Sequence, residues 1–180
     1  MGGDRTERLA DRRRLRRLAE GDRSALAEIY DAHASRLYRH ALWLLGSRQE
    51  AEDVVHDVMI KIAGMGGELL GIRNVRPYLL QMAHRGAVDL IASRGRWKDE
   101  PLDLSPAQDG TADAARAAEA AEACRLLARI DPAQREVVYL HLFEGLTFRE
   151  IGRVIGASMF TAASRYRLAV ERLRREMRLP

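Results

Sequence analysis

Apolar side chains recur along much of this chain at intervals of three and four residues, the period of one face of an α-helix. From Asp22 to Leu45 the period is clear, and Gly46, which can take a positive φ, follows as a stop signal. The pattern predicts one amphipathic helix over this range. Its apolar positions are Leu26, Ile29, Tyr30, Leu37, Tyr38, Ala41 and Leu44.

Two more helices are predicted in the first half of the chain. Ser47 and Glu50 have the spacing of a capping box, in which the hydroxyl and the carboxylate satisfy the first turn of a helix, so a helix is expected from here to about Ala63. The next helix is expected to begin near Asn74 and to continue toward Arg94.

Two stretches interrupt the helical pattern. Residues 64–71 contain four glycines with apolar residues between them, which predicts a mobile, partly apolar loop. Residues 95–111 contain prolines, glycine and acidic residues without apolar periodicity, which is typical of a linker. We therefore expect a domain boundary in this second stretch.

The C-terminal part of the chain shows a second set of helix signals. An alanine-rich segment, residues 112–130, is helical by propensity. Asp131 followed by Pro132 is a strong start signal for another helix, which Gly145 should end.

Two short-range signals then predict a helix-turn-helix. A capping-box pair at Thr147 and Glu150 opens a helix that must end by Gly156, and Ser158 can cap a longer helix that follows. The motif needs a small residue where the helices cross, a turn residue tolerant of positive φ and an apolar anchor on the second helix. These requirements fall on Gly152, Gly156 and Ala162.

Composition agrees with an all-α chain of two small helical domains joined by a flexible acidic linker. The chain has 180 residues, of which 47% are hydrophobic, enough for packed cores, while strand-forming residues never cluster in alternating runs. We divide it into a basic N-terminal extension (1–21), a first domain (22–97), a linker (98–113) and a second domain (114–180).

Charge favours a polyanionic partner without requiring one. The formal net charge is +4, and arginines crowd the first twenty residues, which we interpret as a basic helix that is either a solvated face or a contact to nucleic acid. Cys124 has no second cysteine to pair with, and no apolar run reaches the length of a membrane span. These features predict a cytoplasmic protein without membrane insertion.

The last predicted helix has one packing side and one cationic side. Ala162, Tyr166 and Ala169 share the packing side, whereas the arginines of the other side suit phosphates beside a major groove. The arginines could instead only complement the dipole of their own helix. The candidate DNA-binding residues of the helix-turn-helix are Phe148, Arg149, Arg153, Ser158, Thr161, Ser164, Arg165, Arg167 and Arg172.

Two segments resemble the extracytoplasmic-function (ECF) group of bacterial sigma factors. Residues 130–177, which begin with IDPAQREVVYLHLFEGLTFREIG, resemble the promoter-reading domain 4, and residues 25–62, which end with EAEDVVHDVMIKI, resemble the start of domain 2. The resemblance covers roughly residues 24–96 and 123–177 and leaves the N-terminal extension and the linker without a match.

The resemblance implies a transcription initiation factor whose partners are core RNA polymerase, promoter DNA and, in some members, an anti-sigma factor. Domain 4 would read the minus-35 element and domain 2 would bind polymerase and open the minus-10 element, with residues 65–71 holding a flipped base. The implied polymerase-binding residues are Glu52, Asp53, His56 and Asp57. The implied minus-10 residues are His84, Arg85, Asp89, Arg94, Arg96 and Trp97.

The chain departs from the family pattern at three places. His56 stands where glutamine is usual, and His84 with Arg85 stand where arginine and asparagine are usual. Residues 160–164 read FTAAS in place of GTVKS, so a lysine is lost and phosphate contact there should be weaker. The family also implies that the linker acids mimic a phosphate backbone inside polymerase. The alternative is a passive tether, in which the acids only keep the linker soluble. These acids are Asp99, Glu100, Asp103, Asp109 and Asp113.

Two other classes of function compete with this interpretation of the sequence. An enzyme would have to use the five scattered histidines, of which His56 beside Asp53 and Asp57 is the best placed, but no metal-binding spacing, phosphate loop or nucleophile arrangement results. We therefore predict no catalytic residue, no metal and no cofactor. The stronger alternative is a helix-turn-helix regulator whose N-terminal helices serve for dimerisation or sensing.

Overall fold

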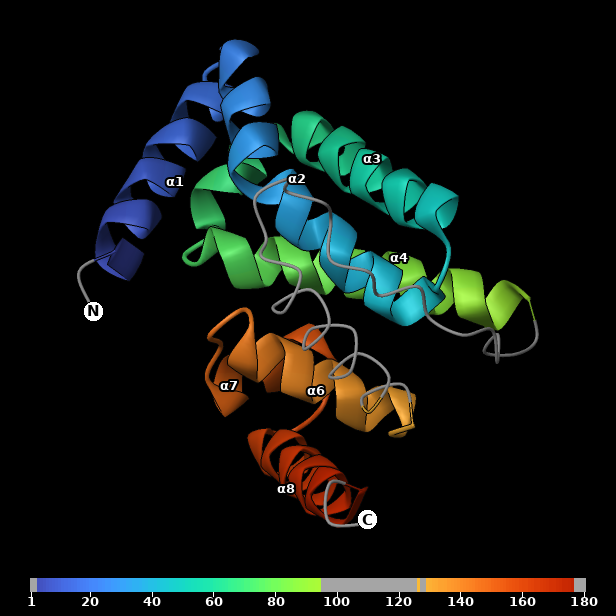
Figure 1. Ribbon diagram of the computed structural model, residues 1–180. Coiled ribbons are helices and arrows are strands. Elements are labelled where there is room, and N and C mark those ends of the chain that lie inside the picture. Colours follow the sequence, from blue (N-terminus) through green and yellow to red (C-terminus); the bar gives the residue numbers. More distant parts are fainter. Residues whose placement is uncertain (1–2, 95–125, 127–128, 177–180) are drawn as a thin grey trace, which may run out of the picture.

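A computed structural model describes residues 3–94, 126 and 129–176 of the chain, which form helices joined by short turns (Figure 1). Within those ranges no strand occurs, so the predicted all-α class is confirmed. The linker and nearly all of the alanine-rich segment lie outside the described residues. The elements are α1 (Gly3–Ala19), α2 (Ser24–Leu45), α3 (Arg48–Gly64), the 3-10 helix η1 (Gly66–Gly71), α4 (Val75–Ser93), α6 (Pro132–Leu142), α7 (Phe148–Val154) and α8 (Met159–Glu176).

Most helix ends follow the local signals of the sequence. Gly46 ends α2 with φ of 67°, and the Asp131 carboxylate accepts hydrogen bonds from the first backbone N–H groups of α6. The Thr147 and Glu150 capping box at α7 is complete. The capping box predicted at Ser47 is wrong, because the Ser47 side chain makes no capping bond and the Glu50 carboxylate pairs with Arg94 instead.

The glycine-rich stretch after α3 is more ordered than the predicted mobile loop. Residues 66–71 form the 3-10 helix η1, in which Gly66 takes φ of 53° and Leu69 is buried. Leu70 beside it is exposed. The buried Leu69 side chain thus anchors a segment whose glycine content alone predicts a flexible backbone.

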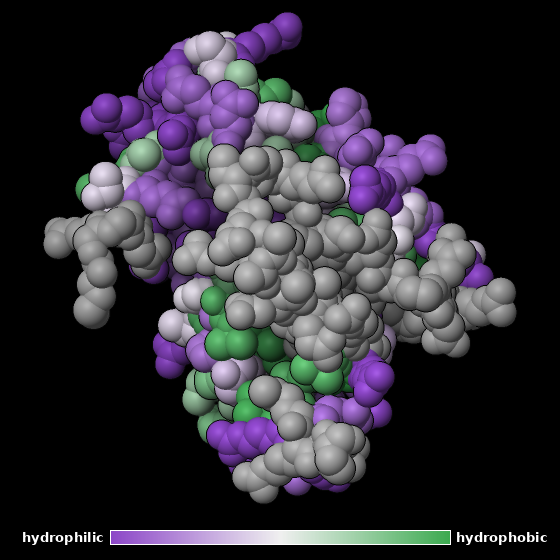
Figure 2. All heavy atoms as spheres, viewed as in Figure 1, coloured by the Kyte–Doolittle hydropathy of each residue, from purple (hydrophilic) through white to green (hydrophobic). Residues whose placement is uncertain are grey.

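Helix α1 packs on the first half rather than extending from it. Leu15 is buried among the core residues, and α1 contacts α2 and η1. The buried Asp11 carboxylate lies 3.0 Å from His33 Nε2 of α2 and accepts a hydrogen bond from Arg14. Much of the hydrophilic surface in Figure 2 covers α1 and the start of α2, so this helix has both a solvated face and a packed one.

The Asp11 carboxylate should make the folded state sensitive to acid. Burial raises its pKa, but hydrogen bonds and charge from His33 and Arg14 outweigh burial and hold the pKa below its ordinary value of 3.8. A carboxylate with a lowered pKa stabilises the fold above its unfolded pKa, and that stabilisation is lost as pH falls through the folded pKa. We expect Asp11→Asn to lower the free energy of unfolding by about 1–3 kcal/mol at pH 7, with a smaller difference from wild type below about pH 4.

Urea unfolding at several pH values measures this difference. Glu20→Gln, which changes an exposed acid just after α1, is the matched control and should follow wild type throughout. If the free energy of unfolding depends on pH in the same way for wild type and Asp11→Asn, ionisation of Asp11 does not contribute to the acid sensitivity of the fold.

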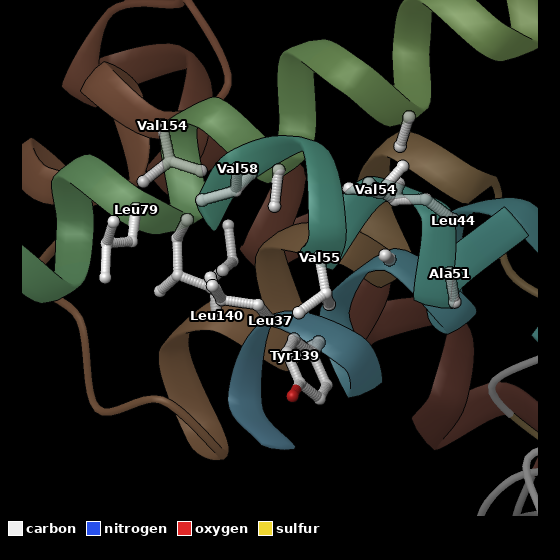
Figure 3. Packing of buried hydrophobic residues seen from close by; sticks show 14 of the residues in the cluster. Leu37, Leu44, Ala51, Val54, Val55, Val58, Leu79, Tyr139, Leu140 and Val154 are labelled. Atoms are coloured by element: carbon white, nitrogen blue, oxygen red, sulfur yellow. The ribbon is translucent and has the colours of Figure 1, made fainter. Parts of the chain in front are cut away.

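The two halves of the chain share one buried cluster. Leu37 of α2, Val55 of α3 and Leu79 of α4 pack together with Leu140 of α6 and Val154 of α7 (Figure 3). In Figure 1, α6, α7 and α8 lie beneath the layer of α2 and α4, and α2 contacts α6 while α4 contacts α7. The halves are therefore docked in this structure, although separate cores were expected from the sequence.

None of the helices in the described ranges combines the length and the apolar character that crossing a bilayer requires.

Candidate nucleic-acid interface

Helices α7 and α8 and the turn between them have the geometry of a helix-turn-helix. A Cβ atom added at Gly152 would lie 2.7 Å from the Ala157 carbonyl oxygen and 3.2 Å from the Met159 nitrogen. The Gly152 carbonyl accepts a hydrogen bond from Ala157 N–H at 2.8 Å, and Gly156 takes φ of 66°. Only glycine at 152 lets the turn approach this closely, as the sequence predicted.

The second helix of the motif is anchored by small and aromatic residues. Ala162 and Ala169 of α8 are fully buried. The rings of His141, Phe148 and Tyr166 come from α6, α7 and α8 and contact one another, with centroids 4.6 Å apart for His141–Phe148 and 4.8 Å for His141–Tyr166. These contacts set the angle at which α8 meets the other two helices.

The outward side of α8 carries most of the predicted DNA-binding residues. Thr161, Arg167 and Arg172 are exposed, and Ser164 and Arg165 are half-buried. Ser158 stands before the helix, and its hydroxyl oxygen accepts the Thr161 backbone N–H at 3.0 Å, which confirms it as the cap. The structure thus gathers these residues on one face at the start and middle of α8.

Three arginines on this face are available to a partner. Arg175 is paired with Glu171, and Glu176 is paired with Arg129. No carboxylate in the described part of the chain pairs with Arg165, Arg167 or Arg172. Among the described residues no ion pair neutralises their positive charge, which suits phosphate groups.

The predicted residues on α7 divide into two kinds. Arg149 and Arg153 are exposed. Phe148 is half-buried, and its ring lies against His141 and Tyr166. The structure thus places Phe148 as a support for α8 rather than on the outward face.

Helix α3 presents an acidic surface on the first half of the chain. Glu52, Asp53, His56 and Asp57 are all exposed, while the valines between them are buried. The four side chains therefore lie on one face of α3, opposite the core.

The predicted minus-10 residues are more dispersed. Arg85 and Asp89 are exposed on α4, and Arg94 is paired with Glu50. His84 faces the second half of the chain, where its Nδ1 lies 2.7 Å from Glu136 Oε1. Arg96 and Trp97 lie outside the described residues.

One polar cluster between the halves was not predicted. His40 Nε2 lies 2.9 Å from the same Glu136 oxygen that His84 contacts. Burial raises the pKa of Glu136, but hydrogen bonds and charge from His40 and His84 outweigh it and lower the pKa to about 2. His40 and His84 precede Glu136 by 96 and 52 residues, so no local pattern could indicate the contact.

Comparison with known proteins places both halves in one family. The family described as Sigma-70 region 2 matches residues 29–96, and Sigma-70, region 4 matches residues 126–175. Proteins called ECF RNA polymerase sigma factor SigK from Mycobacterium bovis (strain BCG / Pasteur 1173P2) and Mycobacterium tuberculosis (strain ATCC 25618 / H37Rv) are each 30% identical over 167 residues, which are 89% of this chain and 89% of theirs.

Solved structures include a similar fold. The chain matches a protein in the structure titled "Structure of CnrH in complex with the cytosolic domain of CnrY" with a TM-score of 0.69 and 23% identity, over 93% of this chain and 97% of that one. This likeness extends through both halves and supports the arrangement of helices described above.

Proposed function

Because this chain belongs to the ECF group of the sigma-70 family of RNA polymerase sigma factors, we propose that its two halves read two elements of one promoter. As a sigma factor, it binds core RNA polymerase and directs promoter-specific initiation of transcription. We propose that residues 22–97 recognise the minus-10 element and residues 114–180 the minus-35 element. Both tasks consist of binding and need no catalytic residue.

The outward face of α8 carries the proposal for the minus-35 element. A capped helix of a complete helix-turn-helix presents Thr161, Ser164 and Arg165 outward, followed by two exposed arginines without a described carboxylate partner. Residues near the start of a recognition helix reach base edges, and arginines farther along it meet phosphates. Arg149 and Arg153 of α7 are exposed, and we propose that they contact phosphates of the DNA backbone.

Helix α4 and η1 carry the proposal for the minus-10 element. Arg85 and Asp89 are exposed on α4, and Leu70 is an exposed apolar side chain of η1. His84 is tied to Glu136 in the docked arrangement. We therefore propose that the halves separate when the factor binds polymerase, which frees His84 for single-stranded DNA.

Arginine substitutions on α8 should weaken promoter binding. Arg165→Ala or Arg167→Ala is expected to cost about 1–3 kcal/mol of binding free energy if the side chain contacts a base. Loss of a phosphate contact instead lowers the salt slope of the affinity by about one. Fluorescence anisotropy with minus-35 DNA at several salt concentrations measures both.

Arg175→Ala, which removes an arginine already paired with Glu171, is the control for charge alone. Unchanged affinity and salt slope for both Arg165→Ala and Arg167→Ala would contradict the placement of the DNA on this face.

The acidic face of α3 is proposed to bind core polymerase. Alanine at Glu52, Asp53, His56 and Asp57 together should lower the affinity for core enzyme while changing the free energy of unfolding by no more than about 0.5 kcal/mol per site, because all four are exposed. Asp31→Ala, on an exposed site of α2, is the control. Full co-purification of the fourfold variant with core enzyme would show that polymerase binds elsewhere.

Reconstituted transcription is the experiment that tests the proposal as a whole. Purified chain is mixed with core polymerase and a promoter library, and the start sites and preferred sequences are read from the transcripts. The proposal requires specific initiation, with substitutions on α8 altering minus-35 preference and substitutions on α4 altering opening at minus-10. Equal sequence preference of the chain with and without core enzyme would contradict it.

Two further assignments follow from the family. We propose that the chain acts in the cytoplasm, where core polymerase works. The structure of CnrH contains the cytosolic domain of CnrY, and by analogy we propose an anti-sigma protein as a partner of this chain. Pull-down with tagged chain in the presence and absence of core enzyme tests whether a partner competes with polymerase.

A further inference from the structure

Three potential metal ligands meet where the two halves of the chain dock. His40 of α2, His84 of α4 and Glu136 of α6 each offer one donor atom, and all three atoms lie within 4.8 Å of one another. His40 and Glu136 are buried, and His84 is 15% exposed. Two histidines and a carboxylate are a donor set that Zn²⁺ binds in proteins, with a fourth position left for water.

Two of the three separations are close to those that a metal ion requires, and the third is at most 4.8 Å. His40 Nε2 and His84 Nδ1 lie 2.9 Å and 2.7 Å from Glu136 Oε1. Donors about 2.1 Å from a tetrahedral ion stand roughly 3.4 Å apart, so each imidazole would move from the carboxylate by only about half an ångström. The partial exposure of His84 leaves a side for water and for the ion to enter.

His40 presents one ring nitrogen to the cluster. Its Nε2 faces the Glu136 carboxylate, whereas its Nδ1 is buried and has no hydrogen-bond partner in the described part of the chain. A metal-bound imidazole carries no proton on the coordinating nitrogen, so binding of an ion here would replace the hydrogen bond between His40 and Glu136.

We propose that His40, His84 and Glu136 bind one divalent transition-metal ion, with Zn²⁺ as the favoured ion, across the two halves of the chain. Two of the ligands come from the first half and the third comes from the second half, so the ion stabilises the docked arrangement. The bound ion would also hold His84 away from DNA. Such a metal site would act apart from promoter recognition and would not depend on which bases are read.

Metal titration of the untagged, full-length chain tests the proposal. After treatment with a chelator and its removal, Zn²⁺ is added in competition with a chromophoric chelator, and Co²⁺ is added separately because tetrahedral Co²⁺ absorbs visible light strongly. We expect one ion per chain and a visible absorption band for Co²⁺. If the folded wild-type chain does not bind one Zn²⁺ or Co²⁺ ion per chain, the proposal is overturned and the three side chains form only a hydrogen-bonded cluster.

Single substitutions then locate the ion. His84→Ala and Glu136→Gln should each lower the affinity for Zn²⁺ by at least about 100-fold, since loss of supporting groups around a metal already costs 10–100-fold. The matched control is His33→Gln, which alters another buried histidine beside a carboxylate, where the described residues offer no third donor. It should bind Zn²⁺ as wild type does.

Far-ultraviolet circular dichroism of each variant shows whether it is folded, and the partly exposed His84 keeps the test usable if Glu136→Gln unfolds. Unchanged affinity in His84→Ala would place the ion elsewhere and overturn the proposal.

Discussion

Replacing Gly152 with alanine is expected to disrupt the helix-turn-helix and with it minus-35 binding. The new Cβ atom would lie 2.7 Å from the Ala157 carbonyl oxygen, and backbone atoms cannot give way as a flexible side chain can. We expect a loss of about 1–3 kcal/mol in the free energy of unfolding, although alanine is the better helix former by about 1 kcal/mol. The shift of α8 against α7 should reduce affinity for minus-35 DNA further, because the exposed arginines would no longer match the groove.

Gly86→Ala is the matched control, since it makes the same chemical change inside another helix. A Cβ atom at Gly86 would meet only Val54 methyl groups at 3.6 Å and 3.7 Å, which is ordinary contact. This variant should be as stable as wild type or more stable by up to about 1 kcal/mol. Thermal unfolding and DNA anisotropy of the two variants provide the comparison, and equal behaviour of both would contradict the close approach at Gly152.

Local signals in the sequence predicted the helices because their causes are local. Gly46, Asp131 and the Thr147–Glu150 pair act on backbone groups within a few residues, and the structure confirms each of them. Ser47 makes no capping bond, and the Glu50 carboxylate, which would complete the predicted box, pairs with Arg94, 44 residues farther along the chain. Competition of that kind is decided by tertiary packing and has no signature in the local pattern.

The buried and exposed faces of α8 could also be predicted, because once the start of a helix is known its period of about 3.6 residues determines which side chains share a face. Ala162 and Ala169 are buried and Thr161 and Arg172 are exposed, as the period requires. The period does not place Phe148, because it stands at the first position of a short helix. Its position depends on its contacts with rings of α6 and α8, which come from elsewhere in the sequence.

Docking of the halves could not be predicted from the sequence. Glu136 looks like a surface residue near the start of a helix, and only the packing of α6 on α2 and α4 buries it between two histidines. The alternative of a regulator with an N-terminal dimerisation or sensor module was also open, because it shares the helix-turn-helix. The match of residues 29–96 to Sigma-70 region 2 decides against it.

The second large effect is expected at Tyr139, whose ring packs between the two halves. Tyr139 is 2% exposed, and the centroid of its ring lies 5.2 Å from the ring centroid of Trp43 and 5.9 Å from that of His40, both on α2. Tyr139→Ala removes this contact and leaves a cavity, so we expect a loss of about 3–5 kcal/mol in the free energy of unfolding. Trp43 should become more exposed to water, and its fluorescence emission should shift to longer wavelength even before unfolding.

Tyr139→Phe separates the ring from its hydroxyl, which donates a hydrogen bond to the Glu144 carboxylate at 3.1 Å. Because phenylalanine keeps the packing on Trp43, this variant should lose only about 1 kcal/mol and keep the native emission. The measurements use a Trp97→Phe background, in which Trp43 is the remaining one of two tryptophans. Urea unfolding is followed by fluorescence and by circular dichroism. If the two halves form one core, both signals move together to lower urea in Tyr139→Ala, whereas native emission of Trp43 in that variant would show that the halves are not packed together in solution.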